Sequence, residues 1–407
     1  MKILIVSARY YPEPFTIVRI AERLSSMGND VTVLTGKPNY GAWKTYDGYE
    51  NVNNEIINGV KVIRVNEKPR KPGFLGVLKN YMNIHKLYKT ALKKMSGSFD
   101  VVLGHVLSPI FTVSYLRRYC KKHNLPSVLY GFDLWPESLV ASGYFKKRSL
   151  FIGALRGYCK KIYNGFDYIT FASPSSETYF KNYLKVNKPF VHIYQPCLTP
   201  LPDFDYISNH DYRCDGYIHI LFCGTIAKFN HLSLFVEALD DDFIKKNVIF
   251  DVVGSGSDYD NVFNEVKKRN LAQNVVFHGR VLAEKTKEFY KKSDVLFVPL
   301  FYNSATSLMI PQKLIEYLMY GRPIFGMIKG DGERIIKEAC EFNVVCDQTV
   351  ESLRQALYKI VHLNNNQLLQ CGLDNRLFYE NNPRFSLNSV CDEISTILKQ
   401  AINEKKS

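Results

Sequence analysis

The sequence predicts an α/β protein made of two Rossmann-like domains, each a doubly wound, mostly parallel sheet. Three observations support this fold class. The chain has 407 residues, more than a single hydrophobic core usually organises. Short apolar strands alternate with amphipathic helical segments, as in parallel sheets that helices cover on both faces. The alternation stops once, at 195–217, and then begins again.

The N-terminal segment predicts one βαβ unit. Residues 2–6, KILIV, form a buried strand, and apolar residues recur at helix spacing through 17–24. Gly28 follows at a position where glycine ends many helices, and 30–35, DVTVLT, alternate as the next strand. Strand, helix and strand in this order are typical of a parallel pair with a crossover helix.

The same alternation predicts the remaining strands. In the N-terminal half they are expected at 60–65, 100–104, 127–131, 167–171 and 190–193. In the C-terminal half they are expected at 218–223, 248–253, 275–279, 294–300, 323–328 and 343–346. Residues 195–217 are rich in Pro, Asp and Tyr and are interpreted as the interdomain linker. Ligands of such sheets bind beyond the carboxyl ends of the strands, so the cleft between the domains is the expected site.

The composition is that of a soluble globular protein, 46% apolar and 23% charged. No apolar run reaches the roughly 18–20 residues of a spanning helix, and the N-terminal strand does not resemble a signal peptide. Nine cysteines without a C-x-x-C pair favour reduced thiols in a cytosolic protein over disulfides or a zinc site.

The net charge of +14 comes entirely from the N-terminal half. Residues 1–200 hold 29 Lys+Arg and 12 Asp+Glu, whereas residues 201–407 hold 24 and 27. A basic half indicates a polyanionic partner, either nucleic acid or an anionic membrane surface. Lysines and aromatic residues interleave in 66–95, and 115–124 and 144–151 add basic patches, as in helices that lie on membranes. A helix packed on the sheet with its lysines in water would explain any one patch.

Two glycine turns follow strands of the second domain. In VVGSGSDYD, Gly254 and Gly256 would let backbone N–H groups and a helix N-terminus approach an anion. An ordinary tight turn is the commoner reason for such glycines. In LFCGTIAKFNHLSLF, Gly224 follows a strand and precedes Lys228, which is placed either to meet a phosphate or as a solvated loop lysine.

The stretch SATSLMIPQKLIEYLMYGRPIF, residues 304–325, is the most specific one. Pro311 suits the first turn of a helix, on which Lys313 and Glu316 are neighbours on one face. A surface ion pair would explain the two charges. Alternatively, Glu316 accepts both hydroxyls of a ribose while Lys313 faces a phosphate.

Polar residues also follow two strands of the first domain. His105 comes at the end of one strand, and YGFDLWPESLVASG places Asp133, Trp135 and Glu137 after the next. The two strands end at the same carboxyl edge of one parallel sheet, so we expect His105 and Asp133 to line the same cleft. A lone histidine is, however, more often structural. Trp135 either stacks on a sugar or packs, and Glu137 is either a second contact or an anchor for the loop.

These motifs together resemble retaining glycosyltransferase family 4, and within it the subgroup that builds bacterial capsule and O-antigen polysaccharides. The resemblance rests on TGKPNYGAWKTYDGY and YGFDLWPESLVASG in the first half. In the second half it rests on CGTIAKF, VGSGSD, FHGRV and PQKLIEYLMYGRP. It implies the GT-B fold, in which two Rossmann-like domains face a central cleft. The implied domains are 1–198, with a crossover helix in 385–407, and 199–384.

The resemblance also implies roles for particular residues. The C-terminal domain would hold a nucleotide diphosphate sugar, UDP-linked in our expectation, with Glu316 on the ribose. The expected donor-binding residues are Gly224, Thr225, Lys228, Asn230, Gly254, Gly256, Arg280, Ser307, Pro311, Lys313 and Glu316. The expected acceptor-binding residues are Phe15, Thr16, Asn39, Tyr40, Trp135 and Glu137. The expected catalytic residues are Asp133, His105 and Glu316.

Three features of the sequence depart from the family pattern. Leu308 stands where many members carry a second glutamate directed at the donor sugar. Thr225 and Asn230 stand where many carry an arginine and a lysine at the diphosphate, so Lys228 or Lys313 would have to supply that charge. The loop PEPFTIV after the first strand lacks the glycines that many members have there.

The expected reaction is transfer of the sugar, with retention at the anomeric carbon, to a polyprenyl-diphosphate-linked saccharide at the inner face of the cell membrane. We expect no metal and no cofactor other than the nucleotide sugar as co-substrate, and no nucleic-acid partner. Two other classes remain open. One is a GT-B enzyme of different chemistry, such as a nucleotide-sugar epimerase or an inverting transferase. The other is a non-enzymatic basic protein that binds membranes or nucleic acid.

Overall fold

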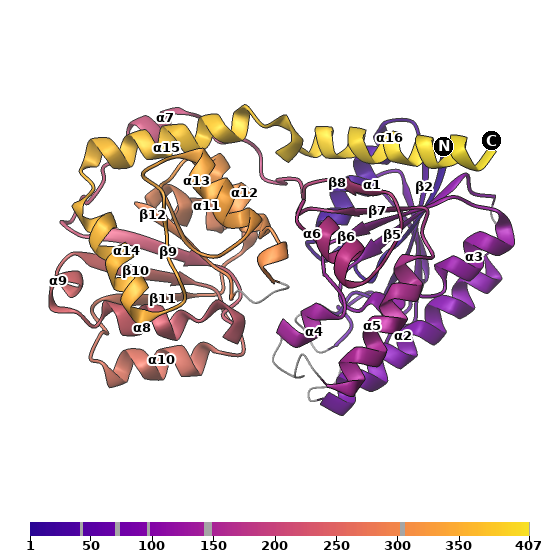
Figure 1. Cartoon of the computed structure of the whole chain (residues 1–407), viewed down its shortest axis with the longest axis horizontal. Coiled ribbons are helices and arrows are strands. Elements are labelled where there is room, and N and C mark those ends of the chain that lie inside the picture. Colours follow the sequence, from indigo (N-terminus) through magenta and orange to yellow (C-terminus); the bar gives the residue numbers. More distant parts are fainter. Residues whose placement is uncertain (41–43, 70–73, 96–97, 142–148, 302–305, 407) are drawn as a thin grey trace. The chain divides into compact units, whose positions relative to one another are not determined.

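The structure is a computed structural model that describes residues 1–40, 44–69, 74–95, 98–141, 149–301 and 306–406. It divides into two compact units, each with a sheet and a core of its own (Figure 1). Unit 1 contains Met1–Leu198 and Arg384–Ser407, and unit 2 contains Thr199–Pro383. Residues 195–217, expected to be a linker, contribute a β-bridge from Cys197 to Ser386 and a short helix, α7 (Asp205–Ser208).

Unit 1 has an eight-stranded sheet in the order β3-β4-β2-β1-β5-β6-β7-β8. All neighbouring strands are parallel except the β3–β4 hairpin. The strands are β1 (Lys2–Val6), β2 (Asp30–Gly36), β3 (Asn54–Ile57), β4 (Val60–Val65), β5 (Val101–Val106), β6 (Ser127–Gly131), β7 (Tyr168–Phe171) and β8 (Phe190–His192).

Helices cover both faces of this sheet (Figure 1). Helices α1 (Thr16–Ser26) and α16 (Leu387–Lys406) pack together on one face, where Ile17 and Ile20 of α1 and Ile394 of α16 join the buried core. Right-handed crossovers place the helices that lead to β5, β6 and β7 on the other face. These are α2 (Phe74–Lys94), α3 (Leu116–His123) and α5 (Leu150–Tyr163). Shorter elements are η1 (Ile110–Thr112), α4 (Glu137–Ala141), α6 (Ser176–Thr178) and η2 (Tyr179–Tyr183).

Unit 2 has a six-stranded, fully parallel sheet in the order β11-β10-β9-β12-β13-β14. Its strands are β9 (Ile218–Cys223), β10 (Val248–Val253), β11 (Val275–Gly279), β12 (Val295–Pro299), β13 (Ile324–Met327) and β14 (Val344–Val345). Its other helices are η3 (Lys228–Asn230), α8 (Leu232–Leu239), α9 (Asp242–Lys245), α10 (Tyr259–Lys268), α11 (Ala283–Lys292), η4 (Thr306–Leu308), α12 (Gln312–Tyr320), α13 (Asp331–Ala339), α14 (Val350–His362) and α15 (Asn365–Glu380). The turn η5 (Pro383–Phe385) spans the boundary between the units.

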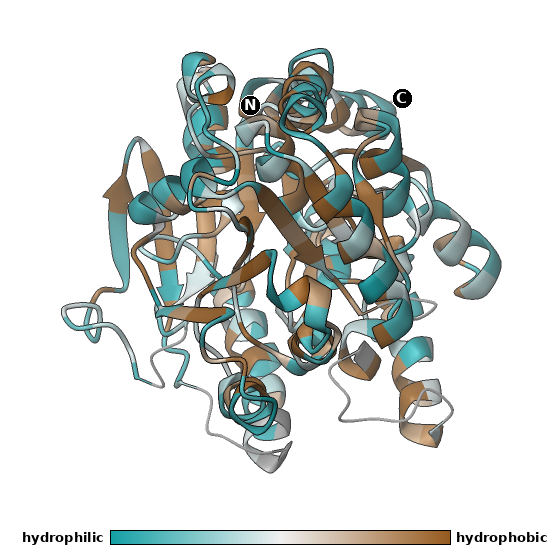
Figure 2. Cartoon of the chain, turned by 90° about the vertical axis from the view of Figure 1, so that its left-hand side faces the viewer, coloured by the Kyte–Doolittle hydropathy of each residue, from teal (hydrophilic) through white to brown (hydrophobic). Residues whose placement is uncertain are grey.

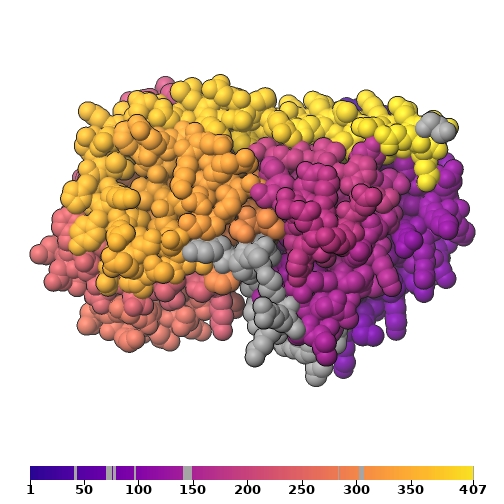
Figure 3. All heavy atoms as spheres, viewed as in Figure 1, coloured from indigo at the N-terminus to yellow at the C-terminus, as the bar shows by residue number. Residues whose placement is uncertain are grey.

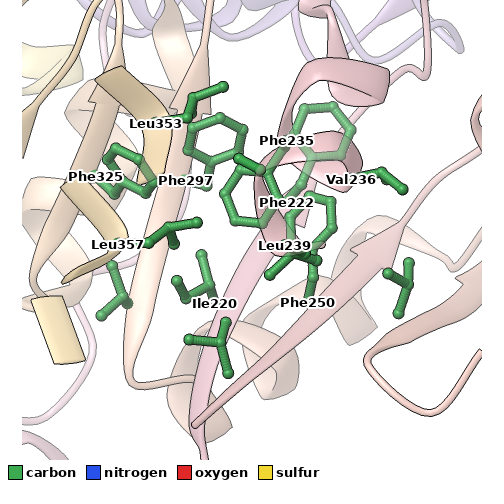
Figure 4. Packing of buried hydrophobic residues seen from close by; sticks show 14 of the residues in the cluster. Ile220, Phe222, Phe235, Val236, Leu239, Phe250, Phe297, Phe325, Leu353 and Leu357 are labelled. Carbon is green, nitrogen blue, oxygen red and sulfur yellow. The ribbon is translucent and has the colours of Figure 1, made fainter. Parts of the chain in front are cut away.

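Aromatic side chains fill the core of unit 2 (Figure 4). Phe222, Phe250, Phe297 and Phe325 come from neighbouring strands, and Phe235 of α8 stacks on Phe250 with ring centroids 4.0 Å apart. Figure 2 shows the apolar strands covered by helices whose outer faces are largely hydrophilic. This arrangement fixes the strand ends from which the turns of the site begin.

The structure confirms the α/β class with two parallel sheets and differs from the expectation at one edge. Strand β3, which was not expected, pairs antiparallel with β4. Asn58 and Gly59 join the two strands with φ angles of 47° and 81°. An Asn-Gly turn of this kind is a strong hairpin signal, so the sequence carried the information.

Candidate functional site

Two glycine turns of unit 2 lie in backbone contact with each other. The turn after β9 contains Gly224, and the turn after β10 contains Gly254 and Gly256. The N–H of Gly224 donates to Val253 (2.9 Å), and the N–H of Ile226 donates to Ser255 (3.0 Å). A Cβ atom on Gly254 would collide with the carbonyl of Gly224, and one on Gly256 with the carbonyl of Ile226. These glycines are therefore required for the close approach of the two turns.

The ammonium group of Lys313 lies beside this pair of turns. Helix α12 begins at Gln312, so Lys313 is on its first turn. The Lys313 Nζ atom is 2.7 Å from the point that a Cβ on Gly224 would occupy and 4.5 Å from the ring centroid of Phe222. Burial lowers the pKa of Lys313 to about 8, while Cys223 and Glu316 oppose the shift. Within the described part of the chain the ammonium has no ion-pair partner, so its charge is available to an anion at the turn.

Glu316 lies one helical turn after Lys313. Its Oε1 atom accepts a hydrogen bond from the hydroxyl of Thr199 (2.7 Å). Burial raises its pKa, and hydrogen bonds from Thr199 and Tyr290 and the charge of Lys313 oppose that shift. No ion pair joins Lys313 to Glu316 among the described residues, so the surface ion pair considered from the sequence is not what the two side chains form.

The other donor-side candidates fall into two groups. Thr225, Lys228 and Arg280 are exposed. Asn230 is buried, and its Nδ2 atom donates to the carbonyl of Thr225 (2.6 Å), so its side chain closes the turn after β9. Asn230 therefore contributes to the structure of this turn.

Ser307 and Pro311 lie before α12. Ser307 belongs to η4, and its carbonyl leaves no room for a Cβ on Gly330, the residue before α13. Pro311 is the N-cap residue of α12, just ahead of the first turn. Leu308 ends η4. Ser304 and Ala305, at the start of the predicted stretch, lie outside the described residues.

A cavity of about 550 Å³ lies at the carboxyl edge of the sheet of unit 1. The residues that line it follow β1, β2, β5 and β6 or come from α2. They are Arg9, Phe15, Asn39, Tyr40, Asn80, Tyr81, Leu107, Ser108, Pro109 and Asp133. Four of these were expected from the sequence: Phe15, Asn39, Tyr40 and Asp133. The rings of Phe15 and Tyr40 meet edge to face with centroids 4.9 Å apart.

Glu13 holds one wall of this cavity in place. Its Oε1 atom accepts hydrogen bonds from the backbone N–H groups of Asn39 (2.8 Å) and Tyr40 (2.7 Å) and lies 3.3 Å from Arg9 Nη1. Arg9 also donates to the side-chain oxygen of Asn39 (3.0 Å). Arg9 and Glu13 were not among the residues predicted from the sequence. Their only local signal was a charged pair four residues apart directly after β1.

Asp133 presents a carboxylate to the same cavity. Its Oδ2 atom accepts the backbone N–H of Ser108 (2.7 Å), which joins the loop after β6 to the loop after β5. Burial raises the pKa of Asp133, and the hydrogen bonds from Ser108 oppose the shift. The aspartate is thus both held in position and close to a space that can take a ligand.

His105, which was expected to line the same cleft as Asp133, does not line this cavity. Its side chain is fully buried, and its Nδ1 atom lies 2.8 Å from the hydroxyl of Ser7. Burial lowers its pKa to about 3, so the ring is neutral. Its ring also contacts that of Phe132, the residue before Asp133, at nearly a right angle with centroids 4.9 Å apart. The expected contact between His105 and a substrate is therefore wrong. The side chain lies inside the fold, where it has a supporting role.

Three expected acceptor contacts are also placed inside the fold. Trp135 is fully buried, and its Nε1 atom donates to the hydroxyl of Ser108 (3.0 Å), so the ring packs. Glu137 is buried in an ion pair with Arg156 (2.8 Å) and accepts the hydroxyl of Tyr179 (2.8 Å), so it anchors the loop. Thr16 is buried in α1 and does not line the cavity.

None of the described helices has both the length and the apolar character that crossing a membrane requires. No group of three or more His, Cys, Asp or Glu side chains in the same residues is placed to hold a metal ion.

Comparisons with known proteins cover both halves of the chain. Residues 15–196 match the family model described as Glycosyltransferase Family 4. Residues 218–362 match the model described as Glycosyl transferases group 1. No curated protein sequence matches the chain.

Solved structures share the fold across nearly the whole chain. Sucrose-phosphate synthase from Thermosynechococcus elongatus is 16% identical, with a TM-score of 0.77 over 99% of this chain and 100% of that one. HepE from Anabaena, in complex with UDP and glucose, is 14% identical, with a TM-score of 0.68 over 98% and 100%. WaaG, a glycosyltransferase involved in lipopolysaccharide biosynthesis, is 16% identical, with a TM-score of 0.69 over 97% and 99%.

Proposed function

Because this chain is a glycosyltransferase of the family 4 type with the GT-B fold, we propose that it moves a sugar from a nucleotide diphosphate sugar to a lipid-linked saccharide. Unit 2 binds the donor and unit 1 binds the acceptor. The donor is UDP-linked, and the product belongs to a bacterial surface polysaccharide of the capsule or O-antigen type.

The observation that carries the donor assignment is the position of Lys313. An ammonium group without an ion-pair partner among the described residues lies beside two interlocked glycine turns, each at the end of a strand. Backbone N–H groups at such turns and a nearby cation are what a diphosphate requires. The HepE structure similar to this chain is a complex with UDP and glucose, which supports a uridine nucleotide here.

The leaving diphosphate needs stabilisation as the bond to the sugar breaks. Lys313 supplies positive charge at the turn, and the first turn of α12 adds the partial charge of a helix N-terminus. We propose that these groups stabilise the leaving diphosphate without a metal ion. We propose that Glu316, one turn further along α12, accepts the ribose hydroxyls in place of the hydroxyl of Thr199.

Retention follows if the acceptor attacks from the face that the diphosphate leaves. The acceptor oxygen forms a bond to the anomeric carbon, the bond from that carbon to the diphosphate oxygen breaks, and the acceptor proton passes to the departing oxygen. Asp133 orients the acceptor hydroxyl from the cavity of unit 1. This transfer requires no enzyme nucleophile.

The cavity of unit 1 has the chemistry of a saccharide site. Its volume of about 550 Å³ can hold a sugar, and aromatic rings, amides, an arginine and a carboxylate line it. Rings pack on the apolar faces of sugars, while the polar groups bond to their hydroxyls. A lipid carrier for that saccharide agrees with the basic N-terminal half, which suits the anionic inner face of a cell membrane.

A panel of nucleotide diphosphate sugars tests the proposal. We expect one UDP-sugar to raise the melting temperature of the protein and to be consumed with a lipid-diphosphate saccharide acceptor. NMR of the product should show the same anomeric configuration as the donor. The inverted configuration would exclude a retaining transferase, and release of an isomerised nucleotide sugar without acceptor would identify an epimerase.

Sugar phosphates should be tested as acceptors with the same nucleotide sugars. The reason is that sucrose-phosphate synthase and a trehalose-6-phosphate synthase share the fold. Transfer to a soluble sugar phosphate, with none to the lipid-linked saccharide, would contradict the acceptor assignment. Salt-sensitive binding to nucleic acid or vesicles without any stabilisation by nucleotides would indicate a non-enzymatic binding protein instead.

A further inference from the structure

Two hydroxyl groups of the chain donate to the carboxylate of Glu316. Its Oε1 atom accepts the hydroxyl of Thr199 at 2.7 Å, and the hydroxyl of Tyr290 is a second donor to the same side chain. Tyr290 is buried on α11, whereas Thr199 is half-buried and is the first residue of unit 2. A carboxylate in a largely buried position needs such donors, because leaving it without them is costly. Thr199 therefore satisfies Glu316 from within the chain.

The segment that carries Thr199 is weakly held. Among the described residues, no hydrogen bond between backbone groups involves 199–203. Pro200 and Leu201, which follow Thr199, are exposed. The segment is next fixed at Pro202, whose carbonyl accepts the Nη2 atom of Arg376 at 2.9 Å. The hydroxyl of Thr199 is thus the group that ties the start of this segment to α12, and another hydroxyl can replace it without breaking a backbone hydrogen bond.

Helix α12, in contrast, is fixed at its end by α15. Arg376 of α15 donates from its Nη1 atom to the carbonyl of Met319 at 3.2 Å. A Cβ atom on Gly372 of α15 would lie 2.5 Å from the carbonyl oxygen of Gly321, so the two helices are in close backbone contact. Figure 1 shows α15 beside α12, and Figure 3 shows the atoms of α15, in yellow, at the surface of unit 2. The partner of Thr199 is therefore on a fixed helix, and Thr199 is the side that can move.

We propose that the hydroxyl of Thr199 takes, before a donor binds, the place that a ribose hydroxyl of the nucleotide takes afterwards. Thr199 is then a positioning residue that holds the carboxylate of Glu316 and competes with the donor for it. Both competing groups are hydroxyls, so the exchange replaces one hydrogen bond to the carboxylate with another and leaves α12 in place. The inference rests on the proposed function, in which Glu316 binds the ribose.

This competition lowers the affinity for the nucleotide. A nucleotide that binds must displace the hydroxyl of Thr199, so its ribose gains less than a full hydrogen bond to a charged group. UDP that is left after transfer of the sugar meets the same competition, and the returning hydroxyl helps it to leave. Removing the hydroxyl of Thr199 should therefore raise the affinity for a nucleotide, and should do so only through the ribose.

Calorimetric titration of UDP into the unchanged protein and into Thr199→Val tests the exchange. Valine keeps the shape of threonine and removes the hydroxyl, so we expect UDP to bind about tenfold more tightly. Thr199→Ser keeps a hydroxyl and should have the affinity of the unchanged protein. Thr396→Val is the matched control, because the hydroxyl of Thr396 bonds within its own helix, α16 of unit 1, to the carbonyl of Asp392 at 2.8 Å. It should bind UDP as the unchanged protein does.

A nucleotide without the ribose hydroxyls shows whether the gain comes through the ribose. Dideoxy-UDP lacks both hydroxyls, so Thr199→Val and the unchanged protein should bind it equally. A gain of the same size for UDP and dideoxy-UDP would overturn the inference, because the ribose hydroxyls would then play no part in it. Thr199→Ala removes the same hydroxyl and should show the same pattern if the valine variant does not fold.

The outcomes separate this inference from the proposed function. Equal or weaker binding of UDP by Thr199→Val, with UDP still bound by the unchanged protein, overturns the exchange at Glu316 and leaves the transferase proposal intact. Failure of the unchanged protein to bind UDP contradicts the proposed donor, and the inference falls with it. Tighter binding of UDP by Thr199→Ser would also overturn the inference, since that variant keeps the competing hydroxyl.

Discussion

The Nζ atom of Lys313 lies 2.7 Å from the point where a Cβ atom on Gly224 would be. The two residues are separated by nearly 90 positions in the sequence, yet the ammonium group occupies the space that the missing side chain leaves. Because Phe222 packs on the same ammonium, the charge is held at the turn and not directed into bulk water. Several properties of the protein should depend on this contact.

Replacing Gly224 with alanine should displace the ammonium of Lys313. The added methyl group would force the lysine away from the turn, so we expect the affinity for a UDP-sugar to fall about tenfold or more. Calorimetric titration measures the change. Gly157→Ala is a suitable control, because a Cβ there meets no atom within 4 Å, and it should leave affinity unchanged. Equal affinity in Gly224→Ala would mean that the turn does not contact the donor.

Donor binding should weaken as the pH rises through the pKa of Lys313. Burial lowers that pKa to about 8, so the ammonium loses its proton in the free protein from about pH 8 upward. The unfolded chain keeps the proton up to the ordinary value of 10.5 and therefore binds more protons between these limits. The Lys313 contribution thus makes stability rise from about pH 8 to 10.5 while donor affinity falls. Lys313→Met should remove this pH dependence of stability and of donor affinity. If both persisted in the variant, Lys313 would be ruled out as their source.

Asp133→Asn should reduce turnover and spare donor binding. The amide keeps the size of the side chain and can accept the N–H of Ser108, but it lacks the negative charge that orients an acceptor hydroxyl. We expect kcat to fall by about 100-fold or more with the dissociation constant for UDP unchanged. Single-turnover kinetics at saturating donor provides the measurement. A normal kcat would remove Asp133 from the acceptor site.

The ion pair between Glu137 and Arg156 should stabilise unit 1. Arg156→Ala leaves a buried carboxylate without its partner, which costs about 3–5 kcal/mol in similar cases. The exposed pair Lys44–Asp47 supplies the comparison, and Lys44→Ala should cost far less stability, because water solvates both charges of that pair. Urea unfolding measures both free energies. Similar small losses in the two variants would show that Glu137 is not an anchor.

Local patterns in the sequence were enough to predict the two sheets. Buried strands such as 218–223 and 248–253 have the bounds in the structure that the sequence predicted, because continuous apolar runs between helical segments have few alternatives in a parallel sheet. Strand β3 was missed although Asn58-Gly59 indicated its hairpin. An edge strand with only one partner has a weak hydrophobic pattern, and its turn was the better signal.

The site was harder to predict, because its orientation depends on contacts distant in the sequence. Every residue of β5 is buried, so no alternation of polar and apolar residues indicates which way His105 points. The loop after β6 turns Trp135 and Glu137 inward through bonds to Ser108 and Arg156, which the local sequence does not reveal. The tight turn at Gly254 and Gly256 was easier to predict, since glycines directly after a strand often allow a close backbone approach. Glu13 acts on backbone groups of Asn39 and Tyr40 and could not be assigned from its neighbours.

The most direct test of the donor site is calorimetric titration of UDP into the unchanged protein, Lys313→Met and Lys287→Met. Methionine keeps the stem of the side chain and removes the charge, and Lys287 is exposed on α11 of the same unit. We predict that Lys313→Met weakens UDP binding by about 30-fold or more, since a charge-assisted contact to phosphate is worth roughly 2 kcal/mol or more. Lys287→Met should bind as the unchanged protein does. Equal affinity in all three would contradict the assignment of the diphosphate to the Gly224 turn and Lys313.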